Sequence, residues 1–402
     1  MGFGIFETCL VKETMNNKDD FSELLSNNKY NTVLESSQKK EKAGRFSADI
    51  NLSKILRRVS LVEKMLFSRH LAVMSKAGLS FSRSLNVLSQ QTKNKYFSEV
   101  ISKVEGDIKG GESLADSLAK HPKVFNELFV NMVRVGETGG NLEEVLKNLA
   151  EQMKKDHEII SKVRGAMIYP AVIVFAMITI GVLMMIFVVP TLLATFQDLE
   201  VELPFATRML VTVSNSFRDH GLLILGSLII SGWLFLAALK TAGGKKRFDF
   251  LALRLPVFGQ IVKKVNLARF TRTLSSLIES GVSINEALNI ISRTLGNTYY
   301  RESLSGAAKD IQKGVDLSGI VDRDKDLYPS LVINMIKVGE ETGTLETTLK
   351  QIAEFYEEEV DQVTANLSSI IEPILMLIIG AAVGFFALSM IQPMYSLMEG
   401  IA

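Results

Sequence analysis

The chain has 402 residues, of which 47% are hydrophobic and 22% charged, and its formal net charge is +1. Such a balanced charge gives no general attraction to nucleic acid, so we expect no direct nucleic-acid partner. The single cysteine, Cys9, excludes an internal disulfide and a cysteine-based metal cluster. The hydrophobic excess has to come from apolar stretches that are separated from the charged ones.

Residues 1–60 are expected to be a disordered or partly helical segment. From Asn16 to about Ala48 the chain is rich in polar residues and poor in large apolar ones, which is typical of disorder. Leu52, Ile55 and Val59 recur at helical spacing beside basic residues, which favours a short basic helix. That helix would either dock on a partner or anionic lipid or simply be solvated.

Residues 61–166 are expected to form a helical bundle, because the apolar residues follow a helical period without any alternating run. Phe67 begins one such face. Gly78 is placed to end that helix, and Ser80 to begin the next.

A glycine-rich stretch, VRVGETGG, runs from Val133 to Gly140 in this bundle. It lacks the terminal Lys and Ser or Thr of a Walker-type phosphate loop, and it lacks the preceding strand of a dinucleotide site. We therefore predict a turn between two helices, with Asn141 as the cap of the second helix and Glu144 completing a capping box.

The run from Ile168 to Val189 contains no charged residue and, at about 1.5 Å per residue, is long enough to cross a bilayer. Gly221 to Leu239 and Ile374 to Ile391 are shorter runs of the same kind. The expected membrane helices are 167–192, 221–239 and 373–392, which leave a short external loop at 193–220, a second bundle at 240–372 and an external tail at 393–402.

Lysine and arginine set the expected orientation. They are abundant before the first span and after the second, whereas the loop between these spans has Arg208 and Arg218 against four acidic residues. The positive-inside rule places the N-terminus and both bundles in the cytoplasm and the C-terminus outside.

No chemistry of a cofactor, metal or catalytic site is predicted. The acidic turn DRDKD at 322–326 lacks the glycine and the glutamate of a calcium loop, and the three spans carry no Asp, Glu, Lys, Arg or His that could relay protons or ions.

An internal repeat organises the chain at an offset of 203 residues. The stretch from Phe67 matches the stretch from Phe270, and VRVGETGG matches IKVGEETG. One unit of a helical bundle followed by a membrane helix has therefore been duplicated. The matching pairs include Phe67 and Phe270, Arg69 and Arg272, Gly78 and Gly281, Gly136 and Gly339, Glu137 and Glu340, Gly140 and Gly343, and Pro170 and Pro373.

These paired motifs, with IYP before the first span and IEP before the last, resemble the type II secretion F family, over about residues 61–397. The resemblance implies an all-α membrane protein with two homologous cytoplasmic bundles and three transmembrane helices. It implies a non-enzymatic platform in the inner membrane, without cofactors, of type IV pili or type II secretion systems. A platform for a DNA-uptake filament is the alternative, and an oligomeric transporter is a more distant one.

The resemblance also implies partners. They are a hexameric assembly ATPase in the cytoplasm, pilin or pseudopilin subunits, other inner-membrane assembly proteins, the bilayer, and further copies of the chain. Gly136, Glu137 and Gly140 mark the first signature turn, and Gly339, Glu340 and Gly343 mark the second. Either turn is expected to stabilise its own bundle or to contact the partner. Pro170 and Pro373 are expected where each cytoplasmic helix enters the membrane. In the second turn Glu341 and Thr342 replace Thr138 and Gly139, so equal contact by both turns is not implied.

Overall fold

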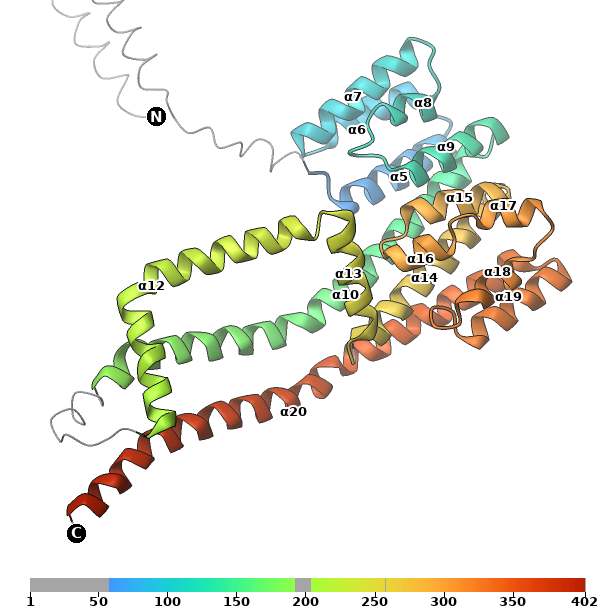
Figure 1. Ribbon diagram of the computed structural model, residues 1–402. Helices are drawn as coiled ribbons and strands as arrows, with labels where there is room; N and C mark the ends of the chain where they lie inside the picture. Colours follow the sequence, from blue (N-terminus) through green and yellow to red (C-terminus); the bar gives the residue numbers. More distant parts are fainter. Residues whose placement is uncertain (1–57, 192–203, 257, 402) are drawn as a thin grey trace, which may run out of the picture. The chain divides into compact units, whose positions relative to one another are not determined.

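The computed structural model describes residues 58–191, 204–256 and 258–401, and every regular element in these ranges is a helix (Figure 1). The expected all-α class is confirmed for this part of the chain. The predictions for the N-terminal segment up to residue 57 lie outside the described residues. The first bundle contains α5 (Leu61–Lys76), α6 (Phe81–Gln91), α7 (Lys95–Lys109), α8 (Leu114–Ala119), α9 (Glu127–Gly139) and the first turns of α10 (Leu142–Leu183).

The second bundle repeats the first with the same offset that the sequence shows. It contains α14 (Phe258–Glu279), α15 (Ile284–Thr294), α16 (Thr298–Ser303), α17 (Ala307–Gln312), α18 (Leu317–Val321), the short 3₁₀ helix η2 (Asp322–Asp324), α19 (Ser330–Thr342) and the first turns of α20 (Leu345–Ile401). The counterpart of α7 is divided into α16 and α17. The division occurs at Gly306, which has a left-handed φ of 89° where the first bundle has Lys103.

Short polar side chains begin most of these helices. The hydroxyl of Ser60 accepts a hydrogen bond from Glu63 N–H, and the Glu63 carboxylate in turn accepts one from Ser60 N–H, which forms a capping box. The Ser80 hydroxyl likewise accepts a hydrogen bond, from Arg83 N–H, at the beginning of α6. Gly78 has a φ of 76° directly after the end of α5, and its counterpart Gly281 has a φ of 88°, so both repeats end this helix with a left-handed glycine.

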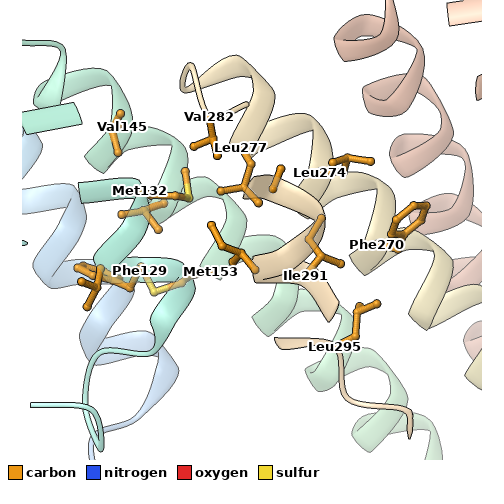
Figure 2. Packing of buried hydrophobic residues seen from close by; sticks show 14 of the residues in the cluster. Phe129, Met132, Val145, Met153, Phe270, Leu274, Leu277, Val282, Ile291 and Leu295 are labelled. Carbon is orange, nitrogen blue, oxygen red and sulfur yellow. The ribbon is translucent and has the colours of Figure 1, made fainter. Parts of the chain in front are cut away.

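Aromatic side chains fill the centre of each bundle. In the first bundle the rings of Phe67, Phe97, Phe125 and Phe129 contact one another, with centroid separations of 4.9 to 6.2 Å. In the second, Phe270, Tyr300 and Tyr328 form edge-to-face pairs at 5.5 and 5.7 Å. Figure 2 shows buried side chains of α9 and α10 in one hydrophobic cluster with those of α14 and α15, so the core continues from one repeat to the other.

Among the residues that the structure describes, two helices are long and apolar enough to cross a membrane, and both begin inside a bundle. They are Leu142–Thr191, which includes α10 and the π-helix η1 (Met184–Val188), and Leu345–Gln392 within α20 (Figure 1). The two parts of α12 (Phe205–Ala238) are bent by 56° relative to each other. They add a third span only if both parts are counted together as one bent span. The expected count of three membrane helices is therefore met only with this broken helix.

Within the stretch expected as an external loop, residues 205–219 are helical and form the first part of α12. Leu210 is buried here with Val189, and Phe386 of α20 packs against the pair. The Ser214 hydroxyl donates a 2.6 Å hydrogen bond to the carbonyl of Met185, inside the π-helix. A short helix, α13 (Ala242–Arg254), then leads from α12 to the second bundle.

Candidate functional site

Each signature turn joins two helices through a left-handed glycine. Gly140, with a φ of 72°, lies between α9 and α10, and Gly343, with a φ of 69°, lies between α19 and α20. A side chain with a Cβ rarely adopts this conformation, so the glycine lets the chain reverse within one residue. The predicted helix-to-helix turn is present in both copies.

The glutamate of each turn reaches back to a helix more than twenty residues earlier in the chain. The Glu137 carboxylate accepts hydrogen bonds from the backbone N–H groups of Leu114 (2.7 Å) and Ala115 (3.1 Å), at the beginning of α8. These N–H groups have no partner within their own helix, and the negative charge suits the helix N-terminus. Glu137 therefore ties the signature turn to α8.

Glu340 makes the equivalent contacts in the second bundle. Its carboxylate accepts from Leu317 N–H and, at 3.0 Å, from Ser318 N–H at the beginning of α18. The residue before α18 is Asp316, whose side chain makes no capping hydrogen bond, whereas the first bundle adds a cap from Ser113. The start of α18 thus depends more heavily on its glutamate.

The first glycine of each turn allows two helices to touch. A Cβ at Gly136 would lie 2.9 Å from the Cβ of Val145, and a Cβ at Gly339 would lie 3.0 Å from the Thr348 hydroxyl oxygen. Both distances are too short for ordinary contact. Gly136 and Gly339 thereby hold α9 against α10 and α19 against α20.

The predicted capping box at Asn141 was wrong. Asn141 precedes α10, but its φ and ψ of −110° and 33° are outside the extended region, and its side chain makes no capping hydrogen bond. A capping side chain folds back on its helix from extended backbone, and the left-handed Gly140 delivers the chain in a different direction. The Thr344 hydroxyl in the second copy lies 2.7 Å from the Thr342 hydroxyl.

The surfaces of the two turns differ, as the sequence indicates. Thr138 is exposed and bonds to the carbonyl of Arg134, whose guanidinium pairs with Asp116 at 2.8 Å. The second turn instead presents Glu341 and Thr342 to solvent. The glutamates that the two turns share are occupied by backbone, whereas these unlike residues face solvent. Contact with a partner stays a prediction.

Of the remaining motif pairs, the arginines lie in different surroundings in the two copies. Phe67 and Phe270 are both buried in the core. Arg69 is exposed, whereas Arg272 donates from Nε to Glu357 Oε1 at 2.8 Å in a mostly buried pair. Pro170 and Pro373 lie inside the continuous helices α10 and α20, near the beginning of their apolar runs.

A polar contact surface that the motifs do not reveal joins the two repeats. The Lys155 ammonium lies 3.2 Å from the Glu357 carboxylate, and Arg269 Nε lies 3.0 Å from Asp156 Oδ1. Although burial opposes it, the Glu357 carboxylate raises the pKa of Lys155. Burial raises the pKa of Asp156 despite the neighbouring Arg269. Gln152 Nε2 also donates to the Thr273 hydroxyl at 2.9 Å. These partners are more than a hundred residues apart in the chain. The only sequence signal for the contacts is that the residues at these positions differ between the two repeats.

Within the described ranges, no group of three or more His, Cys, Asp or Glu side chains could hold a metal ion. The geometry of the two turns is that of packing and capping.

Comparison with known proteins decides the family. The model of the family described as Type II secretion system (T2SS), protein F, matches residues 67–190 and again residues 270–393. The chain belongs to the type II secretion system protein F family. The two matches are again offset by 203 residues, so the family domain and the internal repeat are the same unit. Each domain extends from the beginning of a bundle, through its signature turn, to the end of an apolar helix.

Several curated members of the F family are similar over most of their length. The type IV pilus assembly protein PilC of Thermus thermophilus is 36% identical over 89% of this chain and 88% of its own. PilC of Myxococcus xanthus is 36% identical over 84% and 81%, respectively. The type II secretion system protein F of Aeromonas hydrophila is 32% identical over 91% and 94%. Both pilus and secretion proteins are thus among the relatives.

Proposed function

We propose that this chain is a non-enzymatic platform of the inner membrane that couples a cytoplasmic assembly ATPase to the assembly of pilin or pseudopilin subunits. Membership of the F family and the names of its pilus and secretion relatives support the proposal. The bundles, at about 61–166 and 240–372, would face the cytoplasm, with the N-terminus inside and the C-terminus outside. The basic residues around the bundles support this orientation.

The observation that carries the proposal is the unbroken connection between each signature turn and the membrane. α10 begins two residues after Gly140 and α20 two residues after Gly343, and both helices continue through their prolines into an apolar run. A continuous helix transmits a displacement along its axis, whereas a flexible loop would absorb it. A force that a motor applies to a bundle would therefore reach the bilayer.

The connection can be tested without changing chain length. Replacing Arg164, Ala166 and Met167 by glycine creates four consecutive glycines with the native Gly165, in an exposed part of α10. Glycine costs about 1 kcal/mol per position in a helix relative to alanine. The matched control replaces Arg164, Gly165 and Met167 by alanine, which preserves the helix.

In cells that lack the native chain, the glycine variant should reach the membrane at normal levels but fail to restore filaments or secretion. The alanine control should restore them. Full restoration by the glycine variant would refute mechanical coupling through α10. Hydrolysis of ATP by the purified chain alone, or normal filaments and secretion after its deletion, would refute the platform itself.

A platform for a DNA-uptake filament is the alternative, because it would use the same architecture. An assay of DNA uptake in the deletion strain, beside the filament and secretion assays, separates these systems. The more distant alternative, an oligomeric transporter, would be supported by solute flux in vesicles that contain only this chain.

A further inference from the structure

Exposed large hydrophobic side chains gather on two surfaces of the bundles. Among residues 59–159 they are Leu66 and Val73, and among residues 267–367 they are Leu331, Val338 and Phe355. Their counterparts in the other repeat are not exposed in this way. Ser276, the counterpart of Val73, is buried, and so is Gln152, the counterpart of Phe355. The two repeats thus have the same fold, but each exposes the surface whose counterpart is buried in the other repeat.

The contact between the repeats explains this difference. One face of the first bundle, formed by α9 and α10 and here called the docking face, packs on the second bundle. It includes Val135, Gln152 and Lys155. It is received by a groove between α14 and α20, where Arg272 and Glu357 lie. Because the repeats are equivalent, the second bundle has a docking face of its own, and the first bundle has a groove of its own.

Both of these counterparts are open. The second docking face is formed by α19 and α20 and exposes Leu331 (46%), Val338 (55%) and Phe355 (43%). The groove of the first bundle has a volume of about 570 Å³ between α5 and α10. Its charged lining consists of four basic residues, Arg69, Lys76, Lys147 and Lys154, and two acidic ones, Glu143 and Glu151, beside the apolar Met65, Val73 and Ala150.

The charges of the open surfaces are complementary. Inside the chain, the docking face supplies Lys155 and the groove supplies Glu357, which form an ion pair at 3.2 Å. At the equivalent positions the second docking face has Glu358 and the groove of the first bundle has Lys154. Both are exposed. The pair is kept with its two signs exchanged, which would favour a contact between these two surfaces.

Other contacts between the repeats have compatible counterparts. Val135 comes within 3.9 Å of a Cβ placed at Gly281, so Val338 would face Gly78 of the receiving groove. The ion pair of Glu127 with Arg293 at 2.8 Å corresponds to Ser330 and Gln90, which are both neutral and polar.

The pair of Asp156 with Arg269 has no charged counterpart. Leu66 stands at the position of Arg269, and Glu359, at the position of Asp156, pairs with Lys264 of its own bundle at 2.5 Å. The second contact would therefore lack this ion pair as well as that of Glu127 with Arg293, and it would have more apolar surface than the first.

We propose that the α19 and α20 docking face of one chain occupies the α5 and α10 groove of a second copy, and so repeats between chains the contact that joins the two bundles within one chain. Such a head-to-tail contact produces a ring if its rotation closes and an open row if it does not. The inference deepens the proposed platform by naming its self-association surface. It depends only on the repeat, so its test does not require filament assembly.

Cysteine cross-linking tests the contact between chains. Two differently tagged full-length chains, both with Cys9→Ala, are co-expressed, one with Lys154→Cys and the other with Glu358→Cys. A short bis-maleimide cross-linker, which spans the length of two long side chains where a disulfide cannot, should give in membranes a dimer that contains both tags. Lys155→Cys with Glu357→Cys in one chain should close within the chain without forming a dimer. Lys123→Cys, an exposed lysine outside the groove, paired with Glu358→Cys should give no dimer. Absence of the mixed dimer, while the internal pair closes, would overturn the proposal.

Charge reversal gives an independent measurement on the purified chain in detergent. Lys154→Glu or Glu358→Lys should each weaken association about tenfold, since a like-charge pair replaces an attractive one. The double variant should recover most of the loss, and Lys123→Glu should have no effect. Equal association for all four variants would contradict the proposed pair. A chain that forms the mixed dimer but supports no filament or secretion would refute the proposed function and leave this interface standing.

Discussion

Gly136 and Val145 approach so closely that a Cβ at position 136 would lie 2.9 Å from the Val145 Cβ. The contact brings the last turns of α9 onto the first turns of α10, which is the helix that continues into the apolar run. The motif residue is therefore a packing surface, and a single added methyl group can test it.

Gly136→Ala should destabilise the first bundle by about 1–3 kcal/mol, because Val145 has to move in a filled core. Gly106→Ala is the matched control. Gly106 lies inside α7, and a Cβ there would meet nothing within 4 Å, so this change should be neutral or slightly stabilising. Thermal unfolding of the full chain in detergent measures both. Equal melting temperatures for the two variants would contradict the packing role.

Removal of the glutamate carboxylates should have unequal effects in the two bundles. Glu137→Ala leaves the N–H groups of Leu114 and Ala115 without their acceptors, which should cost about 1–3 kcal/mol. Glu340→Ala should cost more, because the start of α18 has no side-chain cap from Asp316. Hydrogen exchange should become faster first in α8 and in α18, respectively. If exchange stayed unchanged there while binding of the ATPase was lost, the two glutamates would be partner contacts and the capping role would be secondary.

A pH dependence follows from the buried tyrosines of the second bundle. Burial raises the pKa of Tyr300, whose hydroxyl donates to the Leu327 carbonyl at 2.9 Å. Above the ordinary tyrosine pKa of about 10 the unfolded chain loses this proton while the folded chain keeps it, so stability falls as pH rises.

Tyr300→Phe removes both the hydrogen bond and this proton. It should cost about 1 kcal/mol near pH 8, and the difference from the native chain should narrow near pH 11 because only the native chain loses the linked stability. Apparent melting temperatures at the two pH values measure the difference. A gap that stayed constant or widened would show that Tyr300 titrates normally.

The features that local sequence encodes could be predicted. A left-handed glycine at 78, 140 or 343 follows from its place after a helical stretch, and an uncharged apolar run indicates a span. The repeat multiplies this information, because each position is seen twice. The family resemblance was confirmed by the two matches of the family model.

Contacts between distant segments could not be predicted in this way. Nothing near Glu137 in the sequence indicates that it caps α8, because its partners come from another helix. The helix at 205–219 was not predicted, because the stretch was assigned only as the connection between two apolar spans, whereas burial of Leu210 against neighbouring helices stabilises it. The sequence pattern also did not indicate the bend of α12, where His220 has a φ of −125°.

The orientation of the chain is the last prediction, and the structure determines where a reporter should be placed. Ser214, in the predicted external loop, is fully buried and bonded to Met185, so a cysteine there would not report on the solvent side. Asn215 is exposed on the same helix, and Arg247 is exposed on α13 beyond the apolar part of α12.

In a Cys9→Ala background, a membrane-impermeant maleimide should label Asn215→Cys in intact spheroplasts and Arg247→Cys only after permeabilisation. Because the positive-inside rule places basic Lys245–Arg247 in the cytoplasm, the reverse pattern would invert the topology. Labelling of both from outside would instead show that bent α12 does not cross the membrane, since the two reporters lie on either side of its apolar part.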